Sequence, residues 1–420
     1  MRARGSWGAP LVESARKARI SSYFARRSPA ACRMTGIVQQ RRKPRNVCYV
    51  LRHGGAAAEQ GNRSMTDHKR EVEELRVELG RIDGQLLAAL EKRAKTSRRI
   101  GELRKGQPAQ LPLTDRAQIA TLLARASGDM PVEDLRVILA QVYASCLALE
   151  LPVKVAYLAP EGGFAHAAAR ARFGAGAALS ATDTASAALE EVASHRAEFA
   201  VVPIETTTEG PVQSTISALL ATELKIVAEA ELPSDLCLMN RTGNEADVEK
   251  VYATAADHAR AQKAIAGLSR KPSVYDVKTP LMACQLAAED HGAAALAAEV
   301  FGAEHELTVA RPGMVEGGAE RVRYAIVGAR PGGRTGDDAT ACVFSVNDAP
   351  GALLDVLKLF AERGINLRKI QSRPAPGEEW TYLFFVEVGG HATDRPIVSA
   401  FEEVRQKTRF FKVLGSYPSI

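Results

Sequence analysis

Residues 153–169 read VKVAYLAPEGGFAHAAA, and this stretch decides the fold class of the central part of the chain. Its first part, residues 153–159, is mostly apolar and carries valines and a tyrosine, which is typical of a buried strand. The turn signal PEGG follows, and the alanine-rich segment behind it favours a helix. A strand, a turn and a helix in this order begin an α/β sheet. In such sheets the turn at the carboxyl end of a strand is the usual place for a ligand.

The same alternation continues along the chain. Further strands are predicted at 198–204 (EFAVVPI) and 224–232 (LKIVAEAEL), and alanine-rich helices at 182–195 and 258–267. Alternating strands and helices predict a parallel or mixed sheet, so we assign residues 152–330 to one α/β domain.

The preceding segment is helical. Apolar residues recur in steps of three and four from Val72 to Leu103, which is the helical period. Three helices, one of them very long, cannot enclose a core alone. We therefore expect an all-α domain (65–151) that forms a homodimer with intertwined long helices, or a higher homo-oligomer. The predicted elements are a helix over 69–105, a loop over 106–112, a helix that begins at Thr114 or Asp115, and a helix over 131–150.

A third domain is predicted at 338–420, after the glycine-rich linker GARPGGRTGDD (328–338). Its pattern is strand, helix, strand, strand, helix, strand, which is the βαββαβ order of an α+β ferredoxin-like unit. The predicted elements lie at 341–346, 349–363, 365–374, 380–388, 394–406 and 410–417.

Composition excludes several classes of protein. Of the 420 residues, 46% are hydrophobic and 25% charged, as in ordinary globular domains. No apolar run approaches the roughly 18 residues of a membrane span. The six cysteines are scattered and form no CxxC pair, so neither a disulfide framework nor a zinc site is indicated. We expect a cytoplasmic protein that uses no metal and no organic cofactor.

The net charge of +6 is unevenly distributed. Residues 1–64 carry 14 Lys and Arg against 2 Asp and Glu, whereas the remainder is mildly acidic and shows no nucleic-acid footprint. Because no helical period is evident there, we expect 1–64 to be a disordered basic extension. It is either a transit-like segment or upstream sequence translated from a start codon chosen too early.

Arginines mark the helical domain. The apolar residues from Val72 to Leu103 form a seam along the long helix, and Arg93 occupies a seam position that should be apolar. Burying an unpaired guanidinium group costs roughly several kcal/mol. Arg76 and Arg104 flank the seam, and Arg116 opens the second helix. Guanidinium groups bind carboxylates through two parallel hydrogen bonds, so the set suits a small dicarboxylate. The alternative is a set of solvated arginines with one structural ion pair.

This segment resembles the helical chorismate mutases. The matching stretches are LRVELGRID (75–83), LLAALEKR (86–93) and VYASCLALE (142–150). The resemblance implies that Arg76, Arg93 and Arg116 bind the carboxylates of chorismate. It also implies that Arg104 and a protonated Glu150 lie at the ether oxygen. Departures are Arg104 for the family's Lys, Ala117 for Glu and Leu113 for Asp.

Residues 153–327 resemble prephenate dehydratase, in VAYLAPEGGFAHAAA (155–169), VVPIETTTEGPV (201–212) and RVRYAIVG (321–328). The resemblance implies a two-lobed α/β domain that acts on prephenate, with a site lined by Glu205, Thr206, Thr207, Thr279 and Arg323. Glu205 and Arg323 could instead form an internal ion pair that holds the two lobes.

Several substitutions fall in these dehydratase motifs. Val322 stands where the family has the threonine beside the leaving hydroxyl, and valine has no donor. The sequence therefore predicts slow turnover of prephenate, unless another group supplies the proton. The other departures are Gly163 for Thr, Ala165 for Ser, Thr206 for Asn, Thr207 for Ser, and ATAA at 253–256 for S-H-P-Q.

The stretch DAPGALLDVLKLFAERGINLRKIQSRP (348–374) resembles the phenylalanine-binding ACT domain, with Gln371 for Glu as the one departure. Free N–H groups at a helix start can face a ligand carboxylate, and Asn366 could bind its polar end. The alternative is an ordinary turn and cap. The resemblance implies an allosteric site for phenylalanine at Gly351, Ala352, Leu353, Asn366, Ser372, Arg373 and Pro374.

The three modules occur in the order of the fused chorismate mutase–prephenate dehydratases. The resemblance implies a bifunctional enzyme of phenylalanine biosynthesis that converts chorismate through prephenate to phenylpyruvate under phenylalanine feedback. Two alternatives remain open. One is a catalytically weakened paralogue that senses phenylalanine or binds a partner, and the other is an enzyme retuned for a related cyclohexadienyl acid.

Overall fold

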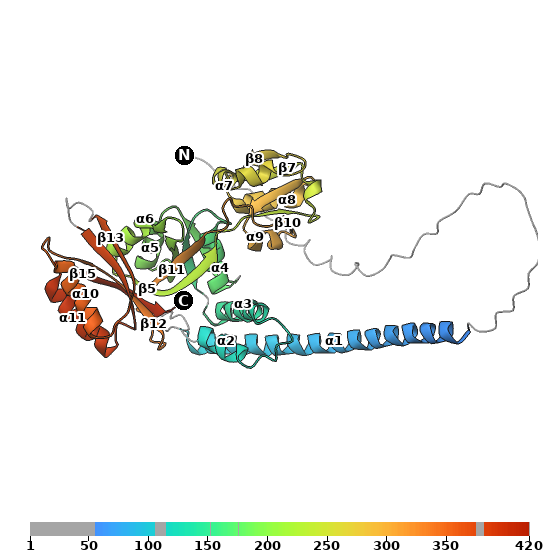
Figure 1. Ribbon diagram of the computed structural model, residues 1–420, viewed down its shortest axis with the longest axis horizontal. Helices are drawn as coiled ribbons and strands as arrows, with labels where there is room; N and C mark the ends of the chain where they lie inside the picture. The colour runs from blue at the N-terminus through green and yellow to red at the C-terminus, as the bar shows by residue number, and fades with distance from the viewer. Residues whose placement is uncertain (1–54, 106–114, 152, 175, 375–381, 420) are drawn as a thin grey trace, which may run out of the picture. The chain divides into compact units, whose positions relative to one another are not determined.

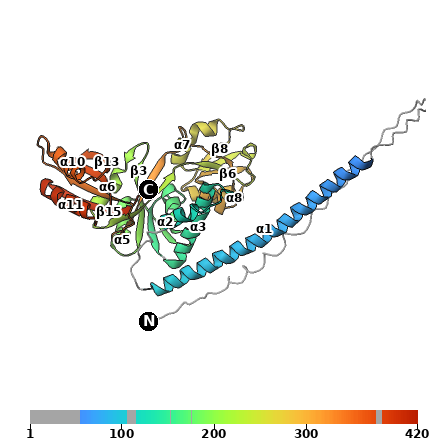
Figure 2. The same ribbon diagram turned by 60° about the horizontal axis from the view of Figure 1, so that its bottom comes forward.

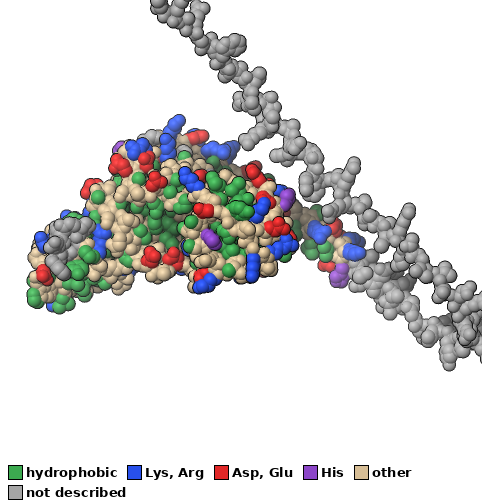
Figure 3. Space-filling view, turned by 90° about the horizontal axis from the view of Figure 1, so that it is seen from above, with side chains coloured by type: hydrophobic (Ala, Val, Ile, Leu, Met, Phe, Trp, Pro, Cys, Tyr) green, Lys and Arg blue, Asp and Glu red, His purple; other side chains and the backbone are tan. Residues whose placement is uncertain are grey.

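The computed structural model describes residues 55–105, 115–151, 153–174, 176–374 and 382–419 (Figure 1). Side chains are described from His68 onward and, in the second helix, from Gln118 onward. Among these residues no helix is long and apolar enough to cross a membrane. Figure 3 shows Lys and Arg interspersed with Asp and Glu on the face it displays, rather than gathered into one basic patch.

The helical domain consists of α1 (Gly55–Leu103), α2 (Asp115–Leu123) and α3 (Val132–Glu150). Figure 2 shows α1 as one uninterrupted helix. It begins before the predicted residue 69, so the expectation that all of 1–64 lacks helix is wrong for residues 55–64. The reason lies in the sequence GAAAEQ at 55–60, because Ala, Glu and Gln have high helix propensity. The loop predicted over 106–112 and the cap at Thr114 lie outside the described residues.

Large apolar side chains along α1 remain exposed. Leu79 and Leu86 are each 58% exposed, and Leu90 is 36% exposed. These residues belong to the predicted seam, and α2 and α3 leave them uncovered. A stripe of exposed leucines on a helix is the expected signature of a face that binds another chain.

The first lobe of the central domain is a mixed sheet with the strand order β5-β11-β3-β1-β2. Strand β1 pairs in parallel with β2 and β3, whereas β11 runs antiparallel to β3 and β5. The strands predicted at 153–159, 198–204 and 224–232 are confirmed. The elements are β1 (Lys154–Leu158), α4 (Phe164–Phe173), β2 (Ala178–Thr182), α5 (Ala185–Ala193), β3 (Phe199–Thr206), β4 (Gly210–Pro211), α6 (Gln213–Leu220), β5 (Lys225–Pro233) and β11 (Arg321–Gly328).

The second lobe is a separate sheet with the order β10-β6-β9-β7-β8. Two segments connect the lobes, and the Ser234 N–H donates to the Glu320 carbonyl oxygen at 2.7 Å where they run together. The predicted two-lobed α/β fold is thus confirmed. The elements are β6 (Cys237–Asn240), the 3-10 helix η1 (Glu245–Asp247), β7 (Lys250–Ala253), α7 (Ala255–Ala266), β8 (Ser273–Asp276), α8 (Pro280–Glu289), β9 (Ala293–Ala297), α9 (Glu299–Glu304) and β10 (Thr308–Arg311).

The C-terminal domain has the predicted βαββαβ order. Its antiparallel sheet runs β13-β14-β12-β15, and α10 and α11 pack against one face around Val356, Phe360 and Phe401. The elements are β12 (Asp338–Ser345), α10 (Ala352–Glu362), β13 (Leu367–Pro374), β14 (Tyr382–Gly389), α11 (Arg395–Lys407) and β15 (Phe410–Pro418).

The C-terminal sheet continues into the first lobe, because β15 pairs in parallel with β5 at Gly415 and Ile226. A Cβ atom on Gly415 would overlap the Ile226 backbone, so only glycine permits this approach. The sequence did not predict this joint between the two domains.

Candidate functional site

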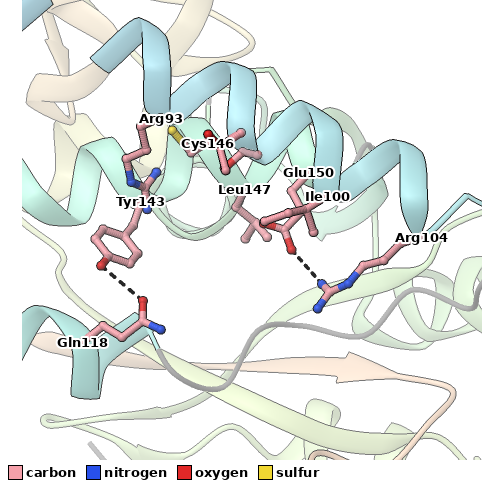
Figure 4. A pocket seen from close by; sticks show the side chains of 10 residues that line it. Arg93, Ile100, Arg104, Gln118, Tyr143, Cys146, Leu147 and Glu150 are labelled. Carbon is pink, nitrogen blue, oxygen red and sulfur yellow. Dashed lines mark hydrogen bonds and ion pairs between the residues drawn. The ribbon is translucent and has the colours of Figure 1, made fainter. Parts of the chain in front are cut away.

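A pocket of about 340 Å³ lies between α1 and α3 (Figure 4). Arg93 and Tyr143 lie at one end of it, and Arg104 and Glu150 at the other. Two guanidinium groups, one carboxylate, and hydroxyl, amide and apolar side chains therefore line this cavity. Its lining is Arg93, Thr96, Ser97, Ile100, Arg104, Gln118, Tyr143, Cys146, Leu147 and Glu150.

Arg93 carries the clearest signal for an anion in this pocket. Its side chain is half-buried, its Nη1 donates to the Val142 carbonyl oxygen at 3.3 Å, and its Cζ lies 4.2 Å from the centroid of the Tyr143 ring. No carboxylate pairs with it among the residues that the structure describes. The structural ion pair that the sequence left open for Arg93 is therefore not seen there, and its charge is available to a ligand.

At the other end of the pocket, the Arg104 Nη1 donates to the Glu150 Oε1 at 2.7 Å. The Glu150 side chain is 16% exposed and the Arg104 side chain 50%, so the carboxylate is largely buried while the guanidinium group reaches solvent. The two side chains that the sequence placed at one substrate oxygen thus contact each other.

Of the other two predicted carboxylate-binding arginines, only Arg76 can be placed, and it lies apart from this lining. Arg76 is exposed and pairs with Glu73 in the same helix, with Nη1 and Oε2 at 3.7 Å. The side chain of Arg116 lies outside the described residues. Thr96, Ser97 and Gln118 line the pocket but were missed. Helical spacing from Arg93 would have found Thr96 and Ser97, because residues three and four apart share a face.

In the central domain, the turn after β1 meets the second lobe. The Leu281 N–H donates to the Glu161 carbonyl oxygen at 3.4 Å. Gly162 has φ +81°, and a Cβ atom there would lie 2.4 Å from the Leu281 nitrogen. Helix α4 begins after this turn, and α8 begins beside it, with Thr279 as N-cap accepting from the Met282 N–H at 3.2 Å. Two helix N-termini thus converge, and each favours negative charge.

His166 contacts the backbone of this turn, and no sequence pattern had singled it out. Its Nδ1 accepts from the Gly162 N–H at 3.0 Å. Its ring stacks on Tyr157 at 4.6 Å between centroids and lies 4.8 Å from Phe301. Burial, together with the charge of Arg170, lowers the pKa of His166 to about 4. The ring is therefore neutral at physiological pH and can accept the glycine N–H.

Thr206, Thr207 and Val322 lie where β3 and β11 pair. Thr206 is directly opposite Val322 in the ladder, and its Oγ1 accepts from the Glu209 N–H at 3.0 Å. The Thr207 Oγ1 accepts from the Arg321 N–H at 3.0 Å. Val322 is 6% exposed and belongs to an apolar cluster that includes Leu158 and Phe164. The apolar residue at 322 is thus well packed, and a hydroxyl lies across the strand pair from it.

Arg323 is committed to three carboxylates. It donates to Glu205 at 2.7 Å, to both oxygens of Glu229 at 2.8 Å and to Glu387 at 2.7 Å. Burial lowers the pKa of Arg323, but the Glu229 and Glu387 carboxylates outweigh it and raise that pKa. Burial likewise raises the pKa of Glu229, against the pull of Arg323.

Glu205 and Arg323 do form an ion pair, but this pair does not connect the two lobes. Glu205 and Arg323 both belong to the first lobe, whereas Glu387 lies on β14 of the C-terminal domain. Lys369 of that domain also pairs with Glu205, and the Tyr417 hydroxyl donates to Glu387 at 3.0 Å. The cluster joins the first lobe to the C-terminal domain.

In the C-terminal domain, Gly351 caps α10 in the left-handed conformation, with φ +86°. Ala352 and Leu353 begin the helix. Asn366 and Ser372 are exposed, at the start and near the end of β13. Pro374 ends this strand. The predicted ligand residues thus form two separate groups, one at the start of α10 and one on β13.

Arg373 points to the first lobe. Only 8% exposed, it donates from Nη1 to the Ser217 Oγ at 3.0 Å on α6. Its Nε and Nη2 have no hydrogen-bond partner among the residues that the structure describes, and burial lowers the pKa of this arginine. A cavity of about 280 Å³ adjoins it, lined by Pro211, Gln213, Ile216, Gln371, Ser372, Arg373 and Phe385. No cluster of three or more His, Cys, Asp or Glu that could hold a metal ion occurs in the described part of the chain.

Comparison with known proteins identifies three family matches in the same order. The family model of chorismate mutase type II matches residues 75–151, that of prephenate dehydratase 155–332, and that of the ACT domain 340–406. The bifunctional chorismate mutase/prephenate dehydratase of Aquifex aeolicus is 36% identical over 354 residues, 83% of this chain and 98% of that protein.

Two further relatives agree with this. The bifunctional chorismate mutase/prephenate dehydratase of Pseudomonas aeruginosa is 29% identical over 358 residues, 83% of this chain and 98% of that protein. Among solved structures, the prephenate dehydratase of Arthrobacter aurescens in complex with L-Phe superposes with a TM-score of 0.53 at 29% identity. The match covers 64% of this chain and 90% of that chain.

Proposed function

Because this chain belongs to the bifunctional chorismate mutase/prephenate dehydratases, we propose that it converts chorismate to prephenate and prephenate to phenylpyruvate, under feedback by phenylalanine. The observation that carries this proposal is Arg93, a half-buried cation at a pocket between α1 and α3 with no carboxylate partner among the described residues. We keep 65–151, 152–330 and 338–420 as the limits of the mutase, dehydratase and ACT modules.

The mutase reaction is a pericyclic rearrangement, so the protein needs no nucleophile. It holds the substrate in a compact conformer and stabilises the charge that develops on the ether oxygen. In our proposal Arg93 binds one carboxylate of chorismate in the pocket. Arg104 and Glu150 lie at the far end, where Arg104 can donate to the ether oxygen from the position in which Glu150 holds it.

A second copy of the chain completes this pocket. Arg76 precedes Arg93 by seventeen residues of α1, a rise of about 25 Å at 1.5 Å per residue, so it cannot serve the same pocket from the same chain. The exposed leucines of α1 supply the apolar face for an antiparallel pairing of two such helices. In that arrangement Arg76 of the second copy reaches the pocket that contains Arg93.

In the dehydratase step, the ring carboxylate leaves as CO₂ and the ring hydroxyl leaves as water. The substrate is a dianion, yet Arg323 is already committed to three carboxylates. We assign the carboxylates of prephenate instead to the N-termini of α4 and α8, which converge at the Gly162–Leu281 contact. Thr279 and Thr206 are the hydroxyls of this region.

The ACT module binds phenylalanine in this proposal. Its carboxylate faces the first turn of α10 at Gly351, Ala352 and Leu353. Asn366 follows the other end of this helix, so in the proposal it reaches the polar end of the same ligand only from a second copy of the chain. Among the described strands β13 pairs with β14 alone, and its other edge suits edge-to-edge pairing of two ACT modules. The four cysteines in the described part of the chain are free, in keeping with a reducing cytoplasm.

A second candidate rests on Val322 and Arg323. Val322 has no hydrogen-bond donor for the leaving hydroxyl, and the charge of Arg323 is already paired with carboxylates. Both features fit a catalytically weakened paralogue that senses phenylalanine. An assay of the purified chain with prephenate and, separately, with chorismate distinguishes the two. Turnover of both substrates supports the enzyme, whereas phenylalanine binding without turnover supports the sensor.

A further inference from the structure

The edge formed by β3 and β11 presents one hydroxyl on the same side of the sheet as Val322. We propose that Thr206 is the hydrogen-bond donor to the departing ring hydroxyl of prephenate. This inference rests on the proposed dehydratase function. It assigns the donor to strand β3, because Val322 on β11 has no hydroxyl to donate. It also replaces the expectation that prephenate turnover is slow.

The pairing of β3 with β11 determines on which face of the sheet the Thr206 side chain lies. Thr206 pairs with Val322, and the preceding pair along the ladder is Glu205 with Arg323. Directly opposite residues of an antiparallel pair point to one face, with Cβ atoms about 5 Å apart. The Glu205–Arg323 ion pair at 2.7 Å marks one face, and Thr206 and Val322 therefore occupy the other.

That other face is the one on which the turn after β1 lies. Val322 belongs to the apolar cluster of Leu158, at the end of β1, and Phe164, at the start of α4. The turn between these two residues contacts Leu281 of the second lobe. A hydroxyl about 5 Å from Val322 is thus beside the point where the two helix N-termini converge.

The hydroxyl of Thr206 also has a free proton. Its Oγ1 accepts from the Glu209 N–H at 3.0 Å, which uses a lone pair and leaves the O–H able to donate. No acceptor for that proton is present among the described residues. By contrast, the Thr182 hydroxyl donates to the Tyr157 carbonyl oxygen at 3.0 Å, and Thr207 lies on the face of Arg321.

The chemistry requires one such donor. The bond from the ring to its carboxylate breaks, CO₂ leaves, and the electron pair enters the ring. The carbon–oxygen bond breaks at the same time, and its pair leaves with the hydroxyl group. The Thr206 O–H stabilises that developing hydroxide, and a solvent proton completes water. Prephenate and one proton thus give phenylpyruvate, CO₂ and water.

The test measures prephenate turnover by the full-length chain and its variants. Removing one positioned donor typically lowers kcat by about 10²–10³-fold. We expect Thr206→Val to lose about 100-fold in kcat with KM little changed, and Thr206→Ser to stay within about tenfold. We expect Val322→Thr to recover at least about tenfold in the Thr206→Val background, because it returns a hydroxyl to the same face. Mutase activity of each variant is measured in the same preparation.

The control is Thr222→Val. The Thr222 hydroxyl also accepts a turn N–H, from Leu224 at 3.3 Å, but it lies before β5 at the opposite end of the sheet. If Thr206→Val unfolds, Thr206→Ala replaces it under the same criterion. Thr279, whose Oγ1 likewise accepts an N–H, that of Met282, and which lies at the same turn, is tested as Thr279→Val.

Two results overturn the inference. One is a folded Thr206→Val chain whose kcat for prephenate is within threefold, about half a decade, of that of the unaltered chain. The other is a loss in Thr279→Val that Thr206→Val does not share, which assigns the donor to Thr279. If the unaltered chain itself leaves prephenate unconverted, the proposed dehydratase function fails instead.

Discussion

The Arg323 Nη2 donates to the Glu387 Oε1 at 2.7 Å, and this contact connects strand β11 of the dehydratase module to strand β14 of the ACT module. Glu387 and Glu229 have side chains only 7% and 2% exposed, so the charges are enclosed. In such a setting, removing one partner of a buried ion pair is costly, since it leaves the other charge unpaired.

We predict that Arg323→Ala lowers the free energy of unfolding by about 3–5 kcal/mol, because the buried Glu229 and Glu387 then lose their cation, and only Glu205 keeps one, Lys369. Arg321→Ala on the same strand is the control. Its side chain is 60% exposed and pairs with Glu231, and such surface pairs contribute about 0–1 kcal/mol. Equal losses in denaturant unfolding of the two variants would contradict the buried network.

The same network gives a pH prediction for Glu229→Gln. Burial raises the pKa of Glu229 in the folded chain, so the folded state holds this proton more tightly than the unfolded state. Stability is therefore lost as pH rises from the ordinary carboxyl range through the raised pKa. Glu229→Gln should remove this loss and be as stable as the unaltered chain at neutral pH, or more stable.

Much of the fold was predictable from the sequence. The α/β alternation, the βαββαβ order and α3 follow from local patterns, since burial and turn chemistry repeat within short windows. The start of α1 was missed because residues 55–60 favour a helix without any apolar period. The β15–β5 joint was missed because it depends on a backbone approach between Gly415 and Ile226, which no local pattern records.

The sites were predictable only in part. Arg93 was singled out as a cation at a seam, and the structure shows a pocket there. The partners of Arg323 were not predictable, because Glu229 and Glu387 lie 94 and 64 residues away along the chain. His166 was missed for the opposite reason. Its contact with Gly162 is local, but a histidine inside an alanine-rich helix carries no pattern that marks it.

His166 should make stability depend on pH. Its pKa falls from 6.5 to about 4 on folding, so the unfolded chain binds the proton more readily. The contribution of the neutral His166 to stability is then fully present above pH 6.5 and is lost as the pH falls through 4. This contribution is about 3 kcal/mol, at 1.36 kcal/mol per pKa unit.

His166→Phe should keep the ring contacts, cost about 1–3 kcal/mol at neutral pH through the unpaired Gly162 N–H, and flatten this acid dependence. His195→Asn, at an exposed position with φ +59°, is the control, because asparagine tolerates that conformation. Unfolding free energies measured from pH 7 to pH 4 check the prediction. An unchanged slope in His166→Phe would contradict it.

Gly351 should be required for phenylalanine binding but not for folding. A Cβ atom there meets nothing within 4 Å, so Gly351→Ala costs only left-handed strain of about 1–2 kcal/mol. We expect phenylalanine affinity to fall about tenfold, because the first turn of α10 must present its N–H groups to the ligand. Gly313→Ala is the control, with φ +67° and equally open space, because it lies after β10 in the second lobe and outside the ACT module. Calorimetric titration that shows equal losses in both variants would assign the effect to strain alone.

The mutase pocket should be shared between two chains. Arg93→Ala and Arg76→Ala should each lower mutase activity by at least about 100-fold, since each removes a carboxylate contact. An exposed arginine of the same helix, Arg99, pairs with Glu102 and is the control as Arg99→Ala. Mixed dimers of the two inactive variants contain one intact pocket, with Arg93 from one chain and Arg76 from the other.

Activity that reappears on mixing therefore supports the shared pocket, and light scattering should show at least a dimer. A fully active Arg93→Ala chain, or a monomer that retains mutase activity, would contradict it.

The most direct test of the whole account is to supply chorismate alone to the purified, unaltered chain and to follow its products over time. We predict that prephenate appears first, that phenylpyruvate and CO₂ follow in equal amounts, and that added phenylalanine slows the second step. Prephenate that accumulates without forming phenylpyruvate, or chorismate that is left unchanged, would contradict the assignment of two working sites to this chain.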